Sequence, residues 1–129
     1  MNITSVIAGA ALGLASTLAT AQEWVDVKSP AELRALYSNK TFKGKDYLDR
    51  PWVGHYRADG QGVMVLHDGS RIPRTWAVEG SDRVCIESQF PRACFRFQRD
   101  KAKAGVYRST NVANDMMTVI VVEDGVPKF

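Results

Sequence analysis

Histidine and cysteine are scarce in this chain, and so are the motifs in which they do chemistry. The 129 residues include two histidines, His55 and His67, and two cysteines, Cys85 and Cys94. No CxxC or HxxxH pair occurs, which argues against a zinc site. The nucleophile-elbow motif GxSxG is also missing. We therefore expect neither a metal nor a cofactor.

The sequence offers few combinations of residues that could form a catalytic site. Ser70, His67 and Asp68 could be drawn as a triad, but they are neighbours in the sequence. A glycosidase would need two convergent carboxylates, whereas nearly all of the 14 acidic residues fall at turns or on predicted polar faces. We therefore predict that the protein is not an enzyme, and keep a small hydrolase around His55 or His67 as a second alternative.

The first 21 residues contain no charged side chain. They carry a small and apolar run from Val6 to Leu18 and end in Ala19-Thr20-Ala21, a small-x-small cleavage pattern. This is typical of a secretory signal peptide, and the run is shorter than the roughly 20 residues of a membrane-spanning helix. No lipobox cysteine follows. We expect cleavage after Ala21 and a periplasmic or secreted domain over residues 22–129.

The charge balance is mildly basic, with 17 Lys and Arg against 14 Asp and Glu and a formal net charge of +3. It is compatible with an anionic envelope surface, an acidic polysaccharide or an acidic partner protein, and equally with ordinary solubilising charge. Export disfavours nucleic acid as a partner.

An oxidising compartment gives the two cysteines a role. They predict one disulfide, Cys85 to Cys94, and the alternative is a pair of free buried thiols. Strand alternation places both sulfurs on the outer face of neighbouring strands. The same register sets Glu87 opposite Arg92, a favourable pair.

The register also has a cost, because it sets Arg83 opposite Arg96. We expect the bridge to be structural, since no CxxC-like setting favours a reactive thiol.

One helix is predicted. Ser29-Pro30-Ala31-Glu32 forms a capping box with proline at the first helical position, so a helix should run from Pro30 to about Tyr37. Leu33, Leu36 and Tyr37 give it a single apolar stripe that packs on something larger.

The rest of the chain reads as strands separated by turn signals. We predict strands over residues 52–58, 63–67, 71–78, 83–88, 94–98, 106–112 and 116–122. Their short connections indicate an antiparallel up-and-down meander that curls into a small lipocalin- or avidin-like barrel, with a further edge strand around Phe42 or Val126. An open bent sheet with the helix against one face is the alternative.

The aromatic faces of two predicted strands meet around one arginine. Trp52 and Tyr56 share a face of one strand, and Arg74 and Trp76 share a face of another. In one interpretation Arg74 packs its stem on Trp76 near a barrel mouth and reaches water. In the other it anchors an anionic or sugar-like ligand in an aromatic pocket.

Several segments resemble a family of small secreted alphaproteobacterial proteins classed as domain of unknown function 995. They are AELRALYSNKTFKG, WVGHYRADG, TWAVEGSDRVCIES, CFRFQRD and GVYRS, and the most specific part runs from Trp76 to Glu87 with the second cysteine at Cys94. The sequence departs from the pattern at Thr75, where glycine is expected. The resemblance implies an exported, envelope-associated role and transfers no catalytic residue.

These features predict a non-enzymatic binding protein of the bacterial cell envelope. The candidate ligand-binding residues are Trp52, Tyr56, Arg74 and Trp76, and the ligand is a small molecule or an envelope glycan. The first alternative is an inhibitor or accessory protein that docks on a periplasmic enzyme such as lysozyme. The sequence leaves the oligomeric state open.

Overall fold

Strands occupy most of the chain that the computed structural model describes, residues 22–129. The predicted signal peptide lies outside the described residues. The elements are β1 (Trp24–Val27), α2 (Pro30–Tyr37), β2 (Lys40–Lys45), β3 (Pro51–Tyr56), β4 (Gln61–Val65), β5 (Arg71–Glu79), β6 (Arg83–Glu87), β7 (Ala93–Asp100), β8 (Val106–Asn111) and β9 (Met117–Asp124).

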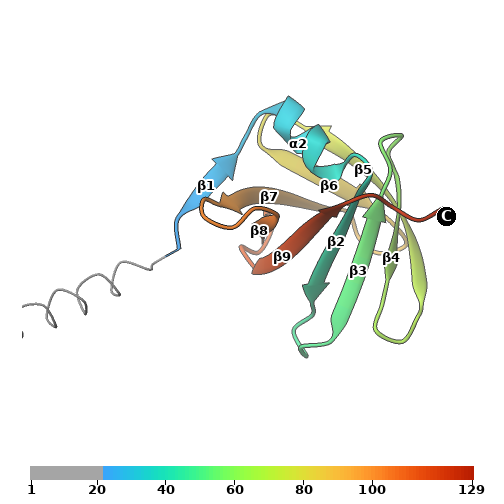
Figure 1. Cartoon of the computed structure of the whole chain (residues 1–129). Helices are drawn as coiled ribbons and strands as arrows, with labels where there is room; N and C mark the ends of the chain where they lie inside the picture. Colours follow the sequence, from blue (N-terminus) through green and yellow to red (C-terminus); the bar gives the residue numbers. More distant parts are fainter. Residues whose placement is uncertain (1–21) are drawn as a thin grey trace, which may run out of the picture.

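Eight of the strands close into an antiparallel barrel (Figure 1). Each strand from β2 to β9 pairs with the next in the sequence, and β9 pairs back with β2 from Lys43 to Lys40. The predicted up-and-down meander is therefore confirmed, and the open bent sheet is wrong. Closure leaves the barrel strands without a free sheet edge along most of their length.

Two segments differ from the sequence prediction. The segment around Phe42 is a full barrel strand, β2, that pairs with both β3 and β9, whereas Val126 lies beyond the last strand. β1 adds a ninth strand that was not predicted, pairing with the second half of β7 from Phe97 to Asp100. β6 pairs with the first half of the same β7 edge, so the long β7 serves both neighbours.

The helix begins at the predicted capping box. The Ser29 Oγ accepts a hydrogen bond from the Glu32 amide at 3.1 Å, and Pro30 occupies the first turn. At the other end the Ser38 amide donates to the Arg34 carbonyl at 2.9 Å. Within residues 22–129, no helix is both long and apolar enough to cross a membrane.

The up-and-down connectivity gives the barrel two distinct ends. The turns after β3, β5 and β7 lie at the end where α2 leads into β2, and we call this the helix end. The turns after β2, β4, β6 and β8 lie at the opposite end, which we call the far end. Figure 1 shows α2 lying across the helix end.

The apolar stripe of α2 fills the helix end. Leu33 is fully buried, and Leu36 and Tyr37 are nearly so. The Tyr37 ring lies 4.6 Å from the Phe42 ring and 4.8 Å from the Tyr56 ring, measured between centroids. These contacts join the helix to the neighbouring strands β2 and β3, and further ring contacts with Trp76 and Phe97 join it to β5 and β7.

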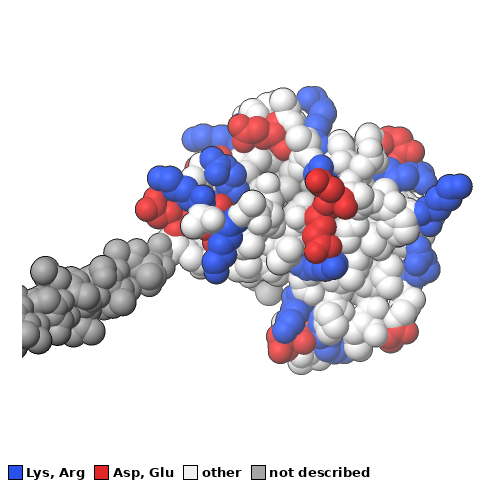
Figure 2. All heavy atoms as spheres, in the orientation of Figure 1, with Lys and Arg blue, Asp and Glu red and all other residues white. Residues whose placement is uncertain are grey.

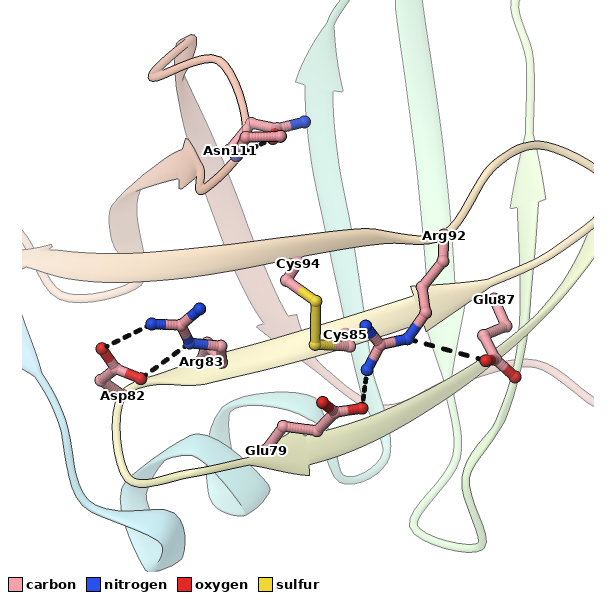
Figure 3. Close-up of a disulfide and its surroundings, with 9 residues drawn as sticks. Glu79, Asp82, Arg83, Cys85, Glu87, Arg92, Cys94 and Asn111 are labelled. Carbon is pink, nitrogen blue, oxygen red and sulfur yellow. Dashed lines mark hydrogen bonds and ion pairs between the residues drawn. A yellow bond between two sulfur atoms is a disulfide. The ribbon is translucent and has the colours of Figure 1, made fainter.

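The disulfide joins Cys85 on β6 to Cys94 on β7, which are directly opposite each other. Neither residue belongs to the core cluster inside the barrel, in agreement with the predicted outward orientation, although Cys85 is only 3% exposed. In Figure 3 the Arg92 guanidinium lies beside the bridge and pairs with two acids, Glu79 on β5 and Glu87 on β6. The predicted Glu87–Arg92 pair is therefore present. Arg83 is paired with Asp82 at 2.9 Å.

Removing the disulfide should destabilise the barrel without changing its shape. The bridge closes a loop between positions 85 and 94, for which the chain-entropy model gives roughly 2 to 3 kcal/mol. We expect Cys85→Ser/Cys94→Ser to lower the free energy of unfolding in urea by that amount and to keep the β-type circular dichroism spectrum. A loss below about 0.5 kcal/mol would contradict a stapling role.

The helix should stabilise the barrel through its buried stripe. Leu33→Ala leaves a cavity between α2 and the strands, and we expect it to lower the free energy of unfolding by about 2 to 5 kcal/mol. Arg34→Ala on the exposed side of α2 is the matched control and should change it by less than about 0.5 kcal/mol. Equal effects of the two substitutions would show that α2 does not seal the barrel.

Candidate functional site

A small cavity lies inside the barrel, between the layer filled by α2 and the far end. Its volume is about 160 Å³. Apolar and aromatic side chains make up most of its wall, and the polar members are Arg74, Ser109 and Thr118. The lining residues are Tyr37, Phe42, Trp52, Tyr56, Met64, Arg74, Ile86, Phe95, Phe97, Ser109, Thr118 and Ile120.

Arg74 enters this cavity from the middle of β5. Its neighbour across the ladder on β4 is Gly62, which has no side chain to occupy the space. The Arg74 Nη1 donates a hydrogen bond to the Tyr56 hydroxyl at 3.0 Å. Arg74 lies on the inner wall beside Tyr56 and is half-buried, so its position is compatible with both interpretations made from the sequence.

Two glycines set the position of Tyr56. A Cβ atom at Gly62 would lie 2.6 Å from the Tyr56 Cδ1, and one at Gly54 would lie 2.9 Å from the Cε2. The ring therefore lies flat against the backbone of β3 and β4, where only glycine allows such close approach. This arrangement brings the hydroxyl within reach of Arg74 and leaves the centre of the barrel less filled.

The Arg74 charge has no acidic partner in residues 22–129. No carboxylate lines the cavity, and none of the ion pairs of the described chain includes Arg74. Its Nε is buried and makes no hydrogen bond with the described residues. A buried donor without a partner costs free energy, as does a partly desolvated charge.

Tyr37 forms the floor of the site. Burial raises the pKa of its hydroxyl well above the usual value, the neighbouring Tyr56 raises it further, and the positive charge of Arg74 opposes the shift. Tyr37 therefore stays neutral at physiological pH and does not neutralise Arg74.

Hydroxyl groups supply the remaining polarity. Ser109 on β8 and Thr118 on β9 face each other across the ladder, and the Ser109 Oγ donates to the Thr118 carbonyl at 3.4 Å. Both are neutral groups that can donate or accept a hydrogen bond. Sequence reasoning missed them, because serine and threonine in a strand carry no distinctive motif.

The structure brings three of the four predicted ligand-binding residues to the cavity. Trp52, Tyr56 and Arg74 line it, whereas Trp76 does not. The Trp76 ring packs on Tyr37 at a centroid distance of 5.3 Å, and its Nε1 donates to the Arg57 carbonyl at 2.8 Å. Trp76 therefore belongs to the sealed helix end, one layer away from the cavity.

The two histidines lie away from the cavity. His55 shares a hydrogen bond of 2.9 Å between its Nδ1 and the Thr41 Oγ1 on the outer face of the barrel. Burial lowers the pKa of His55, and the charges of Arg71 and Lys43 lower it further. His67 is exposed in the turn after β4. Among residues 22–129, no three potential metal ligands come together.

A larger hollow lies at the helix end, with a volume of about 670 Å³. Its charged lining includes Lys40 and Asp124, which pair at 2.8 Å, together with Glu32, Arg99 and Glu123, so the hollow presents charges of both signs. Figure 2 likewise shows basic and acidic side chains interspersed over the visible face. Among the described residues, Arg74 is the one charged side chain that lines the interior cavity, whereas these surfaces carry charges of both signs.

Comparisons with protein-family models, with curated proteins and with solved structures give no match to this chain.

If Arg74 serves a ligand, the barrel should not need its charge. Arg74→Met alone strands the buried Tyr56 hydroxyl and should cost about 1 to 3 kcal/mol. Arg74→Met/Tyr56→Phe removes both partners, so we expect it to unfold in urea with at least the stability of the unmodified protein. A double variant destabilised by more than about 1 kcal/mol would assign Arg74 a structural role.

Proposed function

We propose that this protein is a non-enzymatic binding protein that holds a small anionic ligand inside its barrel, with Arg74 as the anchor. The observation that carries the proposal is the buried Arg74 Nε, which has no partner in a cavity without any described carboxylate. An anion would supply both the missing acceptor and the missing charge.

The chemistry of the anion follows from the orientation of the guanidinium. Tyr56 uses Nη1, so the edge formed by Nε and Nη2 is the one that carries the unpartnered Nε. This edge offers two parallel N–H donors, which match the two oxygens of a carboxylate or of a sulfate or phosphate group. Ser109 and Thr118 add neutral hydrogen-bonding groups.

The size of the cavity limits the ligand. Pockets for drug-sized molecules span about 300–1,000 Å³. The value of about 160 Å³ fits a small anion or the anionic head of a larger molecule. A sugar acid of an envelope glycan is one such ligand, and Trp52 gives it an aromatic wall.

The same proposal covers the cellular compartment of the protein, its type of barrel and the family that its sequence resembles. The disulfide Cys85–Cys94 supports an oxidising compartment, and hence a periplasmic or secreted protein of the cell envelope. The eight-stranded up-and-down barrel supports a lipocalin- or avidin-like binding architecture. The similarity to the secreted family with domain of unknown function 995 would fit this role.

A second candidate is docking on a partner protein such as a periplasmic enzyme. The far end favours it, because the turns there expose Tyr47, Leu48 and Phe90, with Tyr47 84% exposed. Exposed aromatic side chains are typical of interface anchors. A protein that acts only in this way has no need of the unpaired Arg74.

Ligand binding should appear as stabilisation that depends on Arg74. We expect at least one of acetate, sulfate, phosphate and glucuronate to raise the free energy of unfolding over a chloride control of equal ionic strength. A ligand that binds only the folded state adds about 2.7 kcal/mol at a concentration of 100 times Kd. Calorimetric titration gives the Kd directly.

Arg74→Gln should abolish this effect, since the amide has no charge and no forked donor pair. Arg71→Gln on the same strand is the matched control, because Arg71 is exposed on the outer face, and it should bind the anion as the unmodified protein does. Equal binding by Arg74→Gln and the unmodified protein would overturn the proposal, as would a lack of response to every anion.

A further inference from the structure

The barrel wall is split between β2 and β9 toward the far end. The ladder between these strands stops at Lys43 and Val121. β2 nevertheless continues to Lys45 along β3, and β9 begins at Met117 along β8. The facing edges of Gly44–Lys45 and Met117–Ile120 are therefore unpaired with each other, and the two strands diverge.

An apolar groove of about 510 Å³ occupies this split on the outside of the barrel. Valines and a tryptophan dominate its wall. The lining residues are Lys43, Gly44, Lys45, Pro51, Trp52, Val53, Thr118, Val119 and Val121.

The two lysines do not make the groove an anion site. Lys43 pairs with Glu123 at 2.8 Å, and Lys45 pairs with Asp49 at 3.6 Å. Val119 and Val121 are 54% and 42% exposed. The groove therefore presents unprotected apolar surface between lips whose charges are already paired.

The groove and the interior cavity share two lining residues, Trp52 and Thr118. A Cβ atom at Gly44 would lie 2.5 Å from the Trp52 Cζ2 and 3.2 Å from the Ile120 Cγ2. The indole therefore lies against Gly44, between β2 and Ile120 of β9. It forms the partition between the outer groove and the cavity that contains Arg74.

We propose that the groove is the subsite for the hydrocarbon chain of an amphipathic anion whose charged head binds Arg74. This inference rests on the proposed function and specifies its ligand class as a single-chain alkyl carboxylate or sulfate. The cavity has the unpaired charge and little volume, whereas the groove has volume and no unpaired charge. A ligand with a charged head and an apolar chain complements both the cavity and the groove. Such a ligand would cross the barrel wall beside Trp52.

The test is a series of linear carboxylates from acetate to decanoate, titrated calorimetrically below their aggregation concentrations. Each methylene buried in the groove should tighten binding by about two- to fourfold. Arg74→Gln should weaken every member of the series by a similar factor, because all share the carboxylate head.

The groove variant is Val119→Gln/Val121→Gln, which replaces two exposed side chains and should leave the fold intact. It should remove most of the dependence on chain length and leave acetate binding unchanged. Met116→Gln is the matched control: Met116 is 62% exposed at the far end but does not line the groove. It should retain the full dependence.

Fluorescence tests the route past Trp52. A carboxylate brominated along its chain should quench the tryptophan emission, and Trp52→Phe should remove most of the quenching while Trp24 and Trp76 remain.

The outcomes separate the two proposals. If the Kd depends on Arg74 but stays constant from acetate to decanoate, the groove proposal is wrong and the anion site stands. If chain-length dependence survives the valine substitutions, the chain lies elsewhere and the groove proposal is again wrong. If the unpaired edges instead bind a second copy of the chain, a dimer in sedimentation without chain-length dependence also overturns it. If Arg74→Gln binds all members normally, both proposals fail.

Discussion

The packing of the Tyr37 ring inside the helix end is the contact on which the remaining architecture depends. An antiparallel barrel of eight strands is closed along its sides but has two mouths, and its interior must be filled by side chains or by a ligand. Tyr37 contacts Phe42, Tyr56, Trp76 and Phe97 and thereby closes one mouth with aromatic side chains. The cavity consequently has a sealed floor, and the polar chemistry of Arg74 is confined to the half of the barrel that faces the far end.

Glycine residues create the free space in the half of the barrel that faces the far end. Gly54 and Gly62 let Tyr56 lie flat against β3 and β4, and Gly44 lets Trp52 lie against β2. Larger residues at these positions would push both rings toward the centre of the barrel. Three backbone positions without side chains thus set the free volume, the orientation of the Tyr56 hydroxyl and the thickness of the wall at the β2–β9 split. The cavity and the groove therefore have the same structural cause: in each case a glycine allows an aromatic ring to pack closely against a strand.

Much of this could be predicted from the sequence because it follows from alternation and turn chemistry. Side chains of a strand alternate between its two faces, and this puts Arg74 on the same inner face as Trp76. The same alternation sets Cys85 opposite Cys94 and brings Glu87 near Arg92. The prediction was wrong where pairing over a long sequence distance decides the structure. β2 becomes a closing strand only because β9 returns to it, and β1 takes its place in the sheet by pairing with β7. Trp76 was assigned to the pocket because alternation gives the face of a residue but not its level along the barrel axis.

The surroundings of Arg74 support the proposed anion site. Its hydrogen bond to Tyr56 uses one of five donors, and its charge lies among groups that are neutral in the folded protein. Burial raises the pKa of the neighbouring Tyr37, so Tyr37 does not supply a counter-charge near neutral pH. Other charges of the chain, such as Arg92 beside the disulfide or Lys43 at the groove, lie next to carboxylates. Arg74 differs from these residues in facing a cavity that no described carboxylate lines, and the proposed anion site rests on this difference.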